Sequence, residues 1–217
     1  MQRQIVVFLG PSLPREEAER QLAAEYRPPA KRGDITAAAE DGAAIIGLID
    51  GVFFQDCSVG HREVLAVLRR GVRVVGASSM GALRAAELAP FGMEGVGTIY
   101  RWFASGELVS DDEVALTFDP IEYRPLSEPL VNIRATLADA EAQGIIDRET
   151  GGAVLDAALS LYFPKRTYTA ILRAAKAEGE AIERLGAFIA GGGARDLKRE
   201  DALAALARIR TIAGEML

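Results

Sequence analysis

Apolar runs alternate with polar, helix-like stretches from the N-terminus to Pro90. Ile5–Leu9 and Ala44–Ile49 are continuous apolar runs, and Val72 to Val75 after Gly71 give a third strand signal. Continuous apolar strands are typical of sheets buried on both faces. Strands that alternate with helices predict a parallel sheet covered by helices on both sides. We therefore expect an α/β fold with a doubly wound, mostly parallel sheet of the flavodoxin-like or Rossmann-like kind.

Helix signals fill the intervals between these strands. Pro14 opens one helix, with Glu16 and Glu17 in its first turn, where the helix dipole favours acidic side chains. The paired prolines of Tyr26–Ala30 exclude a central strand and indicate a short strand at a sheet edge. The expected helices are Pro14–Ala24, Asp34–Glu40, Arg62–Arg70 and Ala82–Leu88.

The pattern changes after Pro90. A glycine-rich stretch precedes an expected helix over Thr98–Ser105, an expected strand over Asp111–Phe118 and an expected helix over Leu126–Gln143. From Arg148 the chain is rich in Ala and Leu with helical periodicity. We expect an α/β core domain over residues 1–145 and a helical C-terminal extension over residues 146–217, packed on that core.

Composition narrows the function classes. The 217 residues carry a net charge of −6 and contain no long basic run, so the electrostatic footprint of a nucleic-acid-binding protein is missing. The single cysteine, Cys57, excludes an internal disulfide framework and fits a reducing compartment. Neither a signal-peptide pattern nor an apolar run of membrane-spanning length is present. We expect a cytoplasmic protein that binds neither nucleic acid nor a membrane.

The stretch from Gly71 to Glu87 predicts a buried strand, a turn of small residues and a helix. The pattern Ala77-x-Ser79-x-Gly81 resembles a nucleophile elbow, in which a serine attacks the substrate and the following helix N-terminus stabilises an oxyanion. Two other interpretations remain. The turn fits an anion-binding site in which serine only donates a hydrogen bond, and it also fits helix capping by Ser78 or Ser79.

Ligands of open α/β sheets bind beyond the carboxyl ends of the strands. His61 is the only histidine, and we expect the helix that it opens to lie between the Asp50 strand and the Ser79 strand. A Ser79–His61 pair oriented by a carboxylate is a general arrangement for nucleophilic catalysis. The candidate orienting acids are Asp50, Glu63 and Glu87. The residues expected at the strand ends are Gly10, Pro11, Ser12, Asp50, Gly51, Ser78, Ser79 and Met80.

Other side chains offer weaker candidates. Cys57 is a rival nucleophile, but it follows no strand and has no evident oxyanion hole. The acidic residues and His61 show no metal-ligand spacing, so we expect no metal and no cofactor. Arg84 and Arg134 can hold a carboxylate group, or can form salt bridges on their own helices. Gly10, Gly51 and Gly81 would let a peptide tail approach closely.

Several motifs, in this order, closely resemble the TfuA-like core domain over about residues 5–137. They are Phe8-Leu9-Gly10-Pro11-Ser12-Leu13, Tyr26-Arg27-Pro28-Pro29-Ala30-x-x-Gly33-Asp34, Ile49-Asp50-Gly51-Val52-Phe53-Phe54, His61-x-Glu63-Val64-Leu65, Gly76-Ala77-Ser78-Ser79-Met80-Gly81-Ala82-Leu83-Arg84-Ala85-Ala86-Glu87-Leu88, Phe91-Gly92-Met93-x-Gly95-x-Gly97, and Arg124-Pro125-Leu126-Ser127-Glu128 followed by Asn132-Ile133-Arg134.

The resemblance implies a role beside YcaO enzymes, which use ATP to activate backbone amides and install thioamides. TfuA-like proteins are thought to recruit a thiocarboxylated ThiS-like sulfur carrier and to hydrolyse it, which releases sulfide for the YcaO partner. In that role Ser79 would be the nucleophile, His61 its base, and the N–H groups of the Met80 region and the Gly10–Ser12 turn the oxyanion hole. Two alternatives stay open: a non-catalytic adaptor that docks the carrier and activates YcaO, and an ordinary esterase or peptidase.

Overall fold

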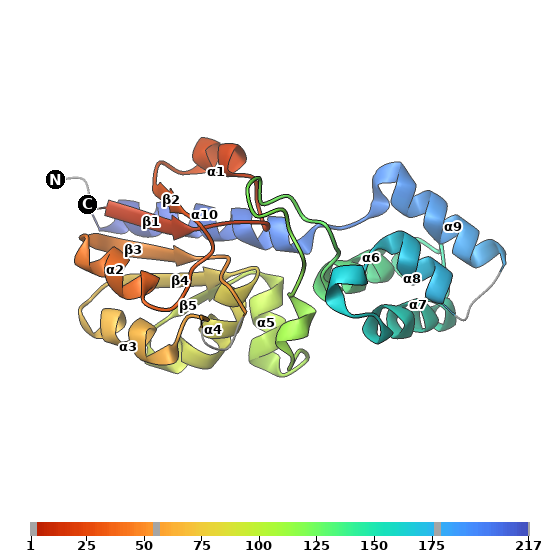
Figure 1. Ribbon diagram of the computed structural model, residues 1–217, viewed down its shortest axis with the longest axis horizontal. Coiled ribbons are helices and arrows are strands. Elements are labelled where there is room, and N and C mark those ends of the chain that lie inside the picture. The colour runs from red at the N-terminus through yellow and green to blue at the C-terminus, as the bar shows by residue number, and fades with distance from the viewer. Residues whose placement is uncertain (1–3, 54–56, 176–178, 217) are drawn as a thin grey trace. The chain divides into compact units, whose positions relative to one another are not determined.

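The computed structural model describes residues 4–53, 57–175 and 179–216 (Figure 1). Phe54, part of one sequence motif, lies outside these ranges. The described residues form a sheet of five strands: β1 (Gln4–Phe8), β2 (Glu25–Arg27), β3 (Ala43–Leu48), β4 (Arg73–Ala77) and β5 (Glu94–Val96).

The strands lie in the order β2-β1-β3-β4-β5, and every neighbouring pair is parallel. This is the flavodoxin-like order, in which the winding direction reverses between β1 and β3. The predicted doubly wound α/β fold is therefore confirmed, and the short strand with paired prolines after it, β2, lies at an edge. The carboxyl ends of β1 and β3 flank the switch point, which is where such sheets bind their ligands.

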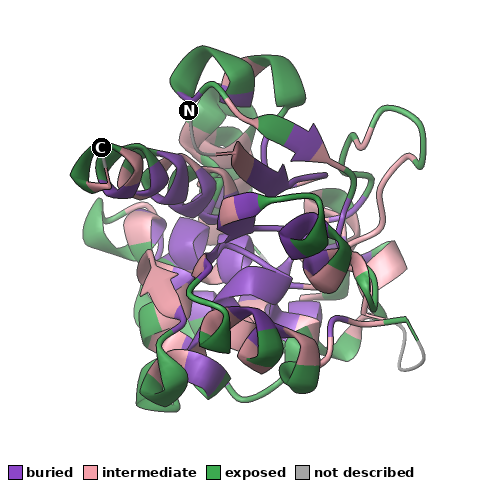
Figure 2. Ribbon diagram, turned by 90° about the vertical axis from the view of Figure 1, so that its left-hand side faces the viewer, coloured by how far each residue is buried: buried purple, intermediate pink, exposed green. Residues whose placement is uncertain are grey.

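Helices cover both faces of the sheet (Figure 1). The helices α2, α3 and α4 pack on one face, and α1 and α10 pack on the other. Strand residues between these layers are coloured as buried in Figure 2, and Val6, Ile45 and Ile46 have no exposed surface. The bounds are α1 (Arg15–Gln21), α2 (Asp34–Glu40), α3 (His61–Arg69), α4 (Met80–Leu88), α5 (Thr98–Ser105) and α10 (Leu197–Glu215).

The chain divides into two compact units. The first comprises residues 1–111 and 198–217, and the second comprises residues 112–197. The second unit has its own apolar core, formed by α6 (Leu130–Ala142), α7 (Arg148–Ser160), α8 (Tyr168–Ala174) and α9 (Glu180–Phe188). This division differs from the expected boundary at residue 145, because α10 contributes its apolar face to the sheet of the first unit.

Three segments differ from the sequence expectations. The acidic triplet Asp111–Glu113 forms a 3₁₀ turn instead of starting a strand. The strand β5 arises in the glycine-rich stretch after Pro90, where Glu94, Gly95 and Val96 pair with the end of β4. The helix α6 begins after Pro129, because proline suits the start of a helix and not its interior. Within the described residues, no helix is both long and apolar enough to cross a membrane.

Candidate active site

The joint between β4 and α4 is a sharp turn centred on Ser78. Ser78 has a φ of 65°, which is rare for a residue with a side chain. The Ser79 N–H donates a 2.7 Å hydrogen bond to the Ala77 carbonyl, which closes a three-residue γ-turn in its strained, positive-φ form. The helix α4 starts at Met80, so Ser79 stands at its N-terminus. The strand–turn–helix predicted around Ser79 is therefore present.

The hydroxyl of Ser79 has a lysine as its partner. Lys198 Nζ donates a hydrogen bond to Ser79 Oγ over 3.1 Å, although 119 positions separate the two residues. Each residue is only 2 % exposed. Lys198 lies in the first turn of α10, and both residues belong to the first unit. A serine hydroxyl beside a lysine amine is a known variant of the catalytic serine arrangement.

Asp50 stands at the carboxyl end of β3 and faces the same lysine. Its Oδ1 lies 4.0 Å from Lys198 Nζ and accepts a 2.7 Å hydrogen bond from Ser12 Oγ. Its Oδ2 accepts the N–H groups of Gly10 and Ser12, at 2.9 and 3.1 Å. Asp50 is 2 % exposed, so its charge is held by these donors and by the lysine instead of by bulk water.

Ser12 connects this carboxylate to the turn at Ser78. Ser78 Oγ donates to Ser12 Oγ over 2.8 Å, and Ser12 Oγ donates in turn to Asp50. Both serines are buried, at 0 % and 2 % exposure. The ends of β1, β3 and β4 are thus joined by side-chain hydrogen bonds, as the sequence reasoning expected of residues at the strand ends.

The structure does not join His61 and Ser79 by a hydrogen bond. His61 is the first residue of α3, its side chain is half exposed, and its Nε2 lies 2.8 Å from Glu87 Oε2. The same Glu87 oxygen accepts a hydrogen bond from Arg84, whose Nε donates to the Val59 carbonyl. The third acid considered, Glu63, accepts the N–H groups of Gly60 and Gly33. His61 and Arg84 therefore share a surface cluster with Glu87.

Most of the backbone N–H groups expected to form an oxyanion hole already have hydrogen-bond acceptors within the protein. The N–H groups of Gly10 and Ser12 are bonded to Asp50, and the Ser79 N–H is bonded within the γ-turn. No acceptor for the Met80 N–H is found among the residues that the structure describes. The Met80 N–H is also the first amide of α4, where the helix dipole favours negative charge. It is the backbone donor that best suits an oxyanion next to Ser79.

The glycines near the site serve close packing. A Cβ atom at Gly81 would lie 1.7 Å from the Leu48 carbonyl oxygen, so only glycine lets α4 approach β3 this closely. A Cβ at Gly51 would lie 2.8 Å from the Met80 side chain, and one at Gly10 would lie 2.4 Å from Pro29. Protein atoms therefore occupy the space beside these three glycines that the sequence reasoning assigned to a substrate tail.

Arg134 belongs to the second unit and has a protein partner there. Its guanidinium makes two hydrogen bonds to the Glu113 carboxylate, at 2.9 and 2.7 Å. Glu113 is 7 % exposed, so the pair is largely shielded from water. The sequence analysis held open a salt bridge as an alternative to ligand binding; the structure contains one, but its acid is largely buried and lies on the Asp111–Glu113 turn, outside α6. Cys57, the rival nucleophile, is exposed in the loop before α3.

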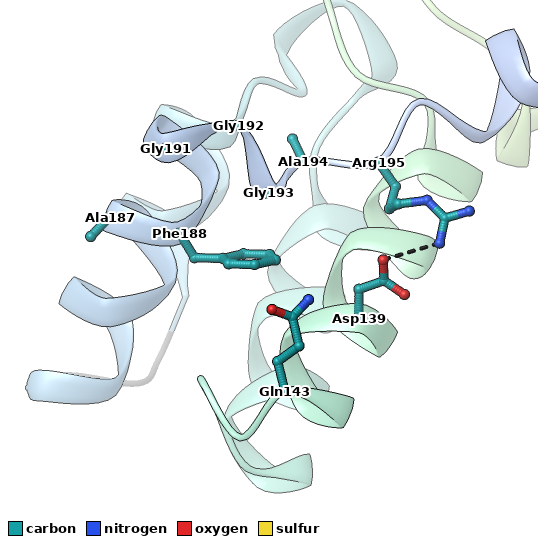
Figure 3. A pocket seen from close by; sticks show the side chains of 9 residues that line it. All are labelled: Asp139, Gln143, Ala187, Phe188, Gly191, Gly192, Gly193, Ala194 and Arg195. Atoms are coloured by element: carbon teal, nitrogen blue, oxygen red, sulfur yellow. Dashed lines mark hydrogen bonds and ion pairs between the residues drawn. The ribbon is translucent and has the colours of Figure 1, made fainter.

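A shallow pocket of about 500 Å³ lies within the second unit (Figure 3). The ring of Phe188 points into it, and its two charged side chains, Asp139 and Arg195, are bonded to each other over 3.0 Å. The pocket holds no nucleophile beside a base. Among the described residues, no group of three or more His, Cys, Asp or Glu side chains is arranged to hold a metal ion.

Sequence reasoning missed Lys198, although the chain carries a signal for it. Lys198 falls on the same helical stripe as Ala202, Ala205, Ile209 and Ile212, all of which are buried against the sheet. A lysine on an apolar stripe is buried at a cost unless it is paired, and is therefore a candidate for chemistry. Reading α10 as part of a separate extension concealed this.

The comparisons with known proteins agree with the motifs. Residues 50–167 match the family model described as TfuA-like protein. No curated protein matches the sequence. The matched segment includes Asp50 and Ser79, whereas Ser12 and Lys198 lie outside it. Because the match covers more than half of the chain, the protein belongs to the TfuA-like family.

Proposed function

We propose that this protein hydrolyses the thiocarboxylate of a ThiS-like sulfur carrier, and that Ser79 is the nucleophile and Lys198 its base. The hydrogen bond of 3.1 Å between Lys198 Nζ and Ser79 Oγ carries the proposal. A serine hydroxyl is a weak nucleophile and needs an adjacent base to become reactive at neutral pH. The amine of Lys198 lies beside the Ser79 hydroxyl, whereas the imidazole of His61 is bonded to Glu87.

The first step transfers the acyl group to the enzyme. With Lys198 in its neutral amine form, Ser79 Oγ forms a bond to the thiocarboxylate carbon while its proton passes to Lys198 Nζ. The C–S bond then breaks, Lys198 returns the proton to the sulfur, and hydrosulfide leaves. The products are an ester at Ser79 and HS⁻, and the charge of the thiocarboxylate is conserved on the sulfide.

The second step regenerates the serine. The oxygen of a water molecule forms a bond to the ester carbon, and the bond from that carbon to Ser79 Oγ breaks. One proton of the water reaches Ser79 through Lys198, the other is released, and the carrier leaves as a carboxylate. The Met80 N–H would stabilise the negative oxygen that develops in both steps. Asp50, 4.0 Å from Lys198 Nζ, would hold the amine in place.

Membership of the TfuA-like family supports the choice of substrate and partner. The family resemblance implies a sulfur carrier as the acyl donor and a YcaO enzyme as the acceptor of the sulfide. A thiocarboxylate is an acyl compound with a sulfide leaving group, so a serine–lysine pair suits it chemically. We propose that the protein works in the cytoplasm as the sulfide-releasing partner of a YcaO enzyme in backbone thioamidation.

One observation favours the alternative function, a non-catalytic adaptor that docks the carrier and activates YcaO. Ser79 and Lys198 are each 2 % exposed, so a substrate reaches them only after a rearrangement. In an adaptor the same network would be a structural tie between the strand ends. Hydrolysis in the absence of YcaO separates the two functions.

The deciding experiment mixes the purified protein with thiocarboxylated carrier and measures sulfide without YcaO. We expect steady release by the wild-type protein and none above background by Ser79→Ala. A carrier with an ordinary C-terminal carboxylate is the substrate control, and simple esters test for a general esterase. If the wild-type protein releases no sulfide but still raises the thioamidation rate of YcaO supplied with free sulfide, the adaptor is correct.

A further inference from the structure

We propose that Asp201 is a positioning residue for Lys198, because it fastens the N-terminal part of α10 to the N-terminus of α5. The inference rests on the proposed function, since it concerns how the base of Ser79 is placed. A lysine side chain has four rotatable bonds, and its amine reaches a fixed point only if the helix that bears it is fixed. Asp201 supplies a tie three residues farther along α10.

The tie consists of two charge-assisted hydrogen bonds. Asp201 Oδ1 accepts the Thr98 N–H over 2.8 Å, and Oδ2 accepts the Ile99 N–H over 2.7 Å. These amides belong to the first turn of α5, where backbone donors have no partner within their own helix. Asp201 is 4 % exposed, and burial raises the pKa of its carboxyl group while the two amide bonds oppose that shift.

Asp201 follows Lys198 by three positions, so the two residues are neighbours on the helix surface. A displacement of Asp201 therefore carries Lys198 with it. The chain also keeps space for the carboxylate: Gly97 has a φ of +97°, and a Cβ atom there would lie 2.2 Å from Asp201 Cγ. The contact thus depends on a glycine and an acid that are distant in sequence.

The competing explanation is that Asp201 only caps α5. The N-cap residue of α5 is Gly97, which has no side chain to serve its amides, so a capping role exists in any case. A cap affects stability, whereas a positioning residue affects the turnover of bound substrate. The test must therefore compare the catalytic constant with stability, in variants that break the tie from either side.

The first variant is Thr98→Pro, which leaves Asp201 unchanged. Proline is well suited to the first position of a helix, and the substitution removes both the N–H that Asp201 accepts and the Thr98 hydroxyl. The matched control is Thr98→Ala, which keeps that N–H and removes only the hydroxyl that accepts from Arg101. We expect kcat for sulfide release to fall about 100-fold in Thr98→Pro with KM nearly unchanged, as a misplacement of about 1 Å can cause. Thr98→Ala should remain near the wild-type value.

The second pair of variants loosens α10 at two places. Asp201→Asn weakens the tie near Lys198, while Arg208→Gln breaks an ion pair with Glu94 farther along the same helix. The ten residues from Lys198 to Arg208 span about 15 Å of helix. At equal losses of thermal stability, Asp201→Asn should lower kcat and Arg208→Gln should not. Equal kcat values in these two variants would overturn the positioning role.

A structural readout keeps this inference separate from the proposed function. Crystal structures of Thr98→Pro and Asp201→Asn should show Lys198 Nζ beyond hydrogen-bond distance of Ser79 Oγ. If the 3.1 Å contact persists in both, Asp201 does not position Lys198, whatever the activity. If the contact is lost while the wild-type protein proves unable to release sulfide, the positioning role stands and the hydrolytic function fails.

Discussion

Lys198 Nζ donates to Ser79 Oγ over 3.1 Å, and each residue comes from a different part of the α/β unit. Ser79 follows β4, an interior strand of the sheet. Lys198 lies in the first turn of α10, which packs on one face of that sheet. This contact changes the chemical interpretation of the site. The sequence contains one histidine, but a serine that is paired with a lysine needs no imidazole as its base.

Replacing Ser79 by alanine should abolish sulfide release and leave the fold intact. The loss of a nucleophile lowers the rate by several orders of magnitude, because the remaining groups cannot act alone. Ser78→Ala is the matched control, since it removes the neighbouring hydroxyl and its bond to Ser12 but leaves Ser79 paired with Lys198. Sulfide release and circular dichroism are measured for both. A folded Ser79→Ala protein with near-normal turnover would exclude Ser79 as the nucleophile.

The variants Lys198→Met and His61→Gln distinguish the two candidate bases. Methionine fills similar space without an amine, and Asp50 keeps its three donors from Gly10 and Ser12, so the fold should persist. We expect Lys198→Met to lose at least about 1,000-fold in kcat and His61→Gln to stay within a few-fold of wild type. Sulfide release measured over a range of carrier concentrations gives both values. The opposite ranking would return the role of base to His61.

Arg134→Ala should destabilise the second unit more than it weakens carrier binding. The substitution leaves Glu113, which is 7 % exposed, without its bidentate partner. An unpaired buried carboxylate costs about 3 kcal/mol or more, and the partial exposure of Arg134 reduces this to about 1–3 kcal/mol. Arg124→Ala is the control, because its pair with Glu122 is exposed and 3.9 Å long. Thermal melting and titration with labelled carrier are compared; lost affinity at unchanged stability would indicate that Arg134 binds the carrier.

The ionisation of Tyr26 should lower the stability of the protein at alkaline pH. Burial raises the pKa of Tyr26 to about 12, and its hydroxyl donates to the carbonyls of Ala18 and Leu22. The unfolded chain loses this proton near pH 10, about two units earlier than the folded one, so stability falls as pH rises through that interval. Tyr26→Phe should cost about 1 kcal/mol at pH 7 and show a shallower alkaline decline in urea titrations. Burial also raises the pKa of Tyr168, so part of the decline remains. Identical declines in both proteins would contradict the assignment.

The sheet and its helices could be predicted because their signals are local. The helices α2 and α5 have the expected bounds, and β1 and β3 each start and end one residue earlier than expected. Apolar periodicity and residues that favour helix starts suffice for such elements. The strand β5 was not predicted, because three residues with a central glycine form no recognisable strand pattern. They pair only because the end of β4 lies beside them. The strand expected to start at the acidic triplet Asp111–Glu113 was wrong. The triplet forms a 3₁₀ turn in which Glu113 accepts a hydrogen bond from Arg134, and a local pattern does not show a partner so distant in sequence.

The candidate site likewise contains residues whose position the sequence predicts and residues whose position it does not. The convergence of Ser12, Asp50 and Ser79 follows from the rule that the carboxyl ends of parallel strands meet at one edge. Lys198 could not be placed by that rule, because a helix far along the chain brings it to the sheet. His61 was expected near Ser79 from the order of the elements alone, but that order does not fix the direction of a side chain at the first residue of a helix.

Residues 112–197 interrupt the sequence of the α/β unit between α5 and α10, and this has a consequence for the rate of folding. The contact between Ser79 and Lys198 closes a long loop, and the entropy lost on closure grows with the length of flexible chain in that loop. The inserted residues have their own apolar core, so folding them first removes much of that flexible length. Substitutions that unfold residues 112–197 should therefore slow the arrival of Lys198 at Ser79, even where they touch neither residue.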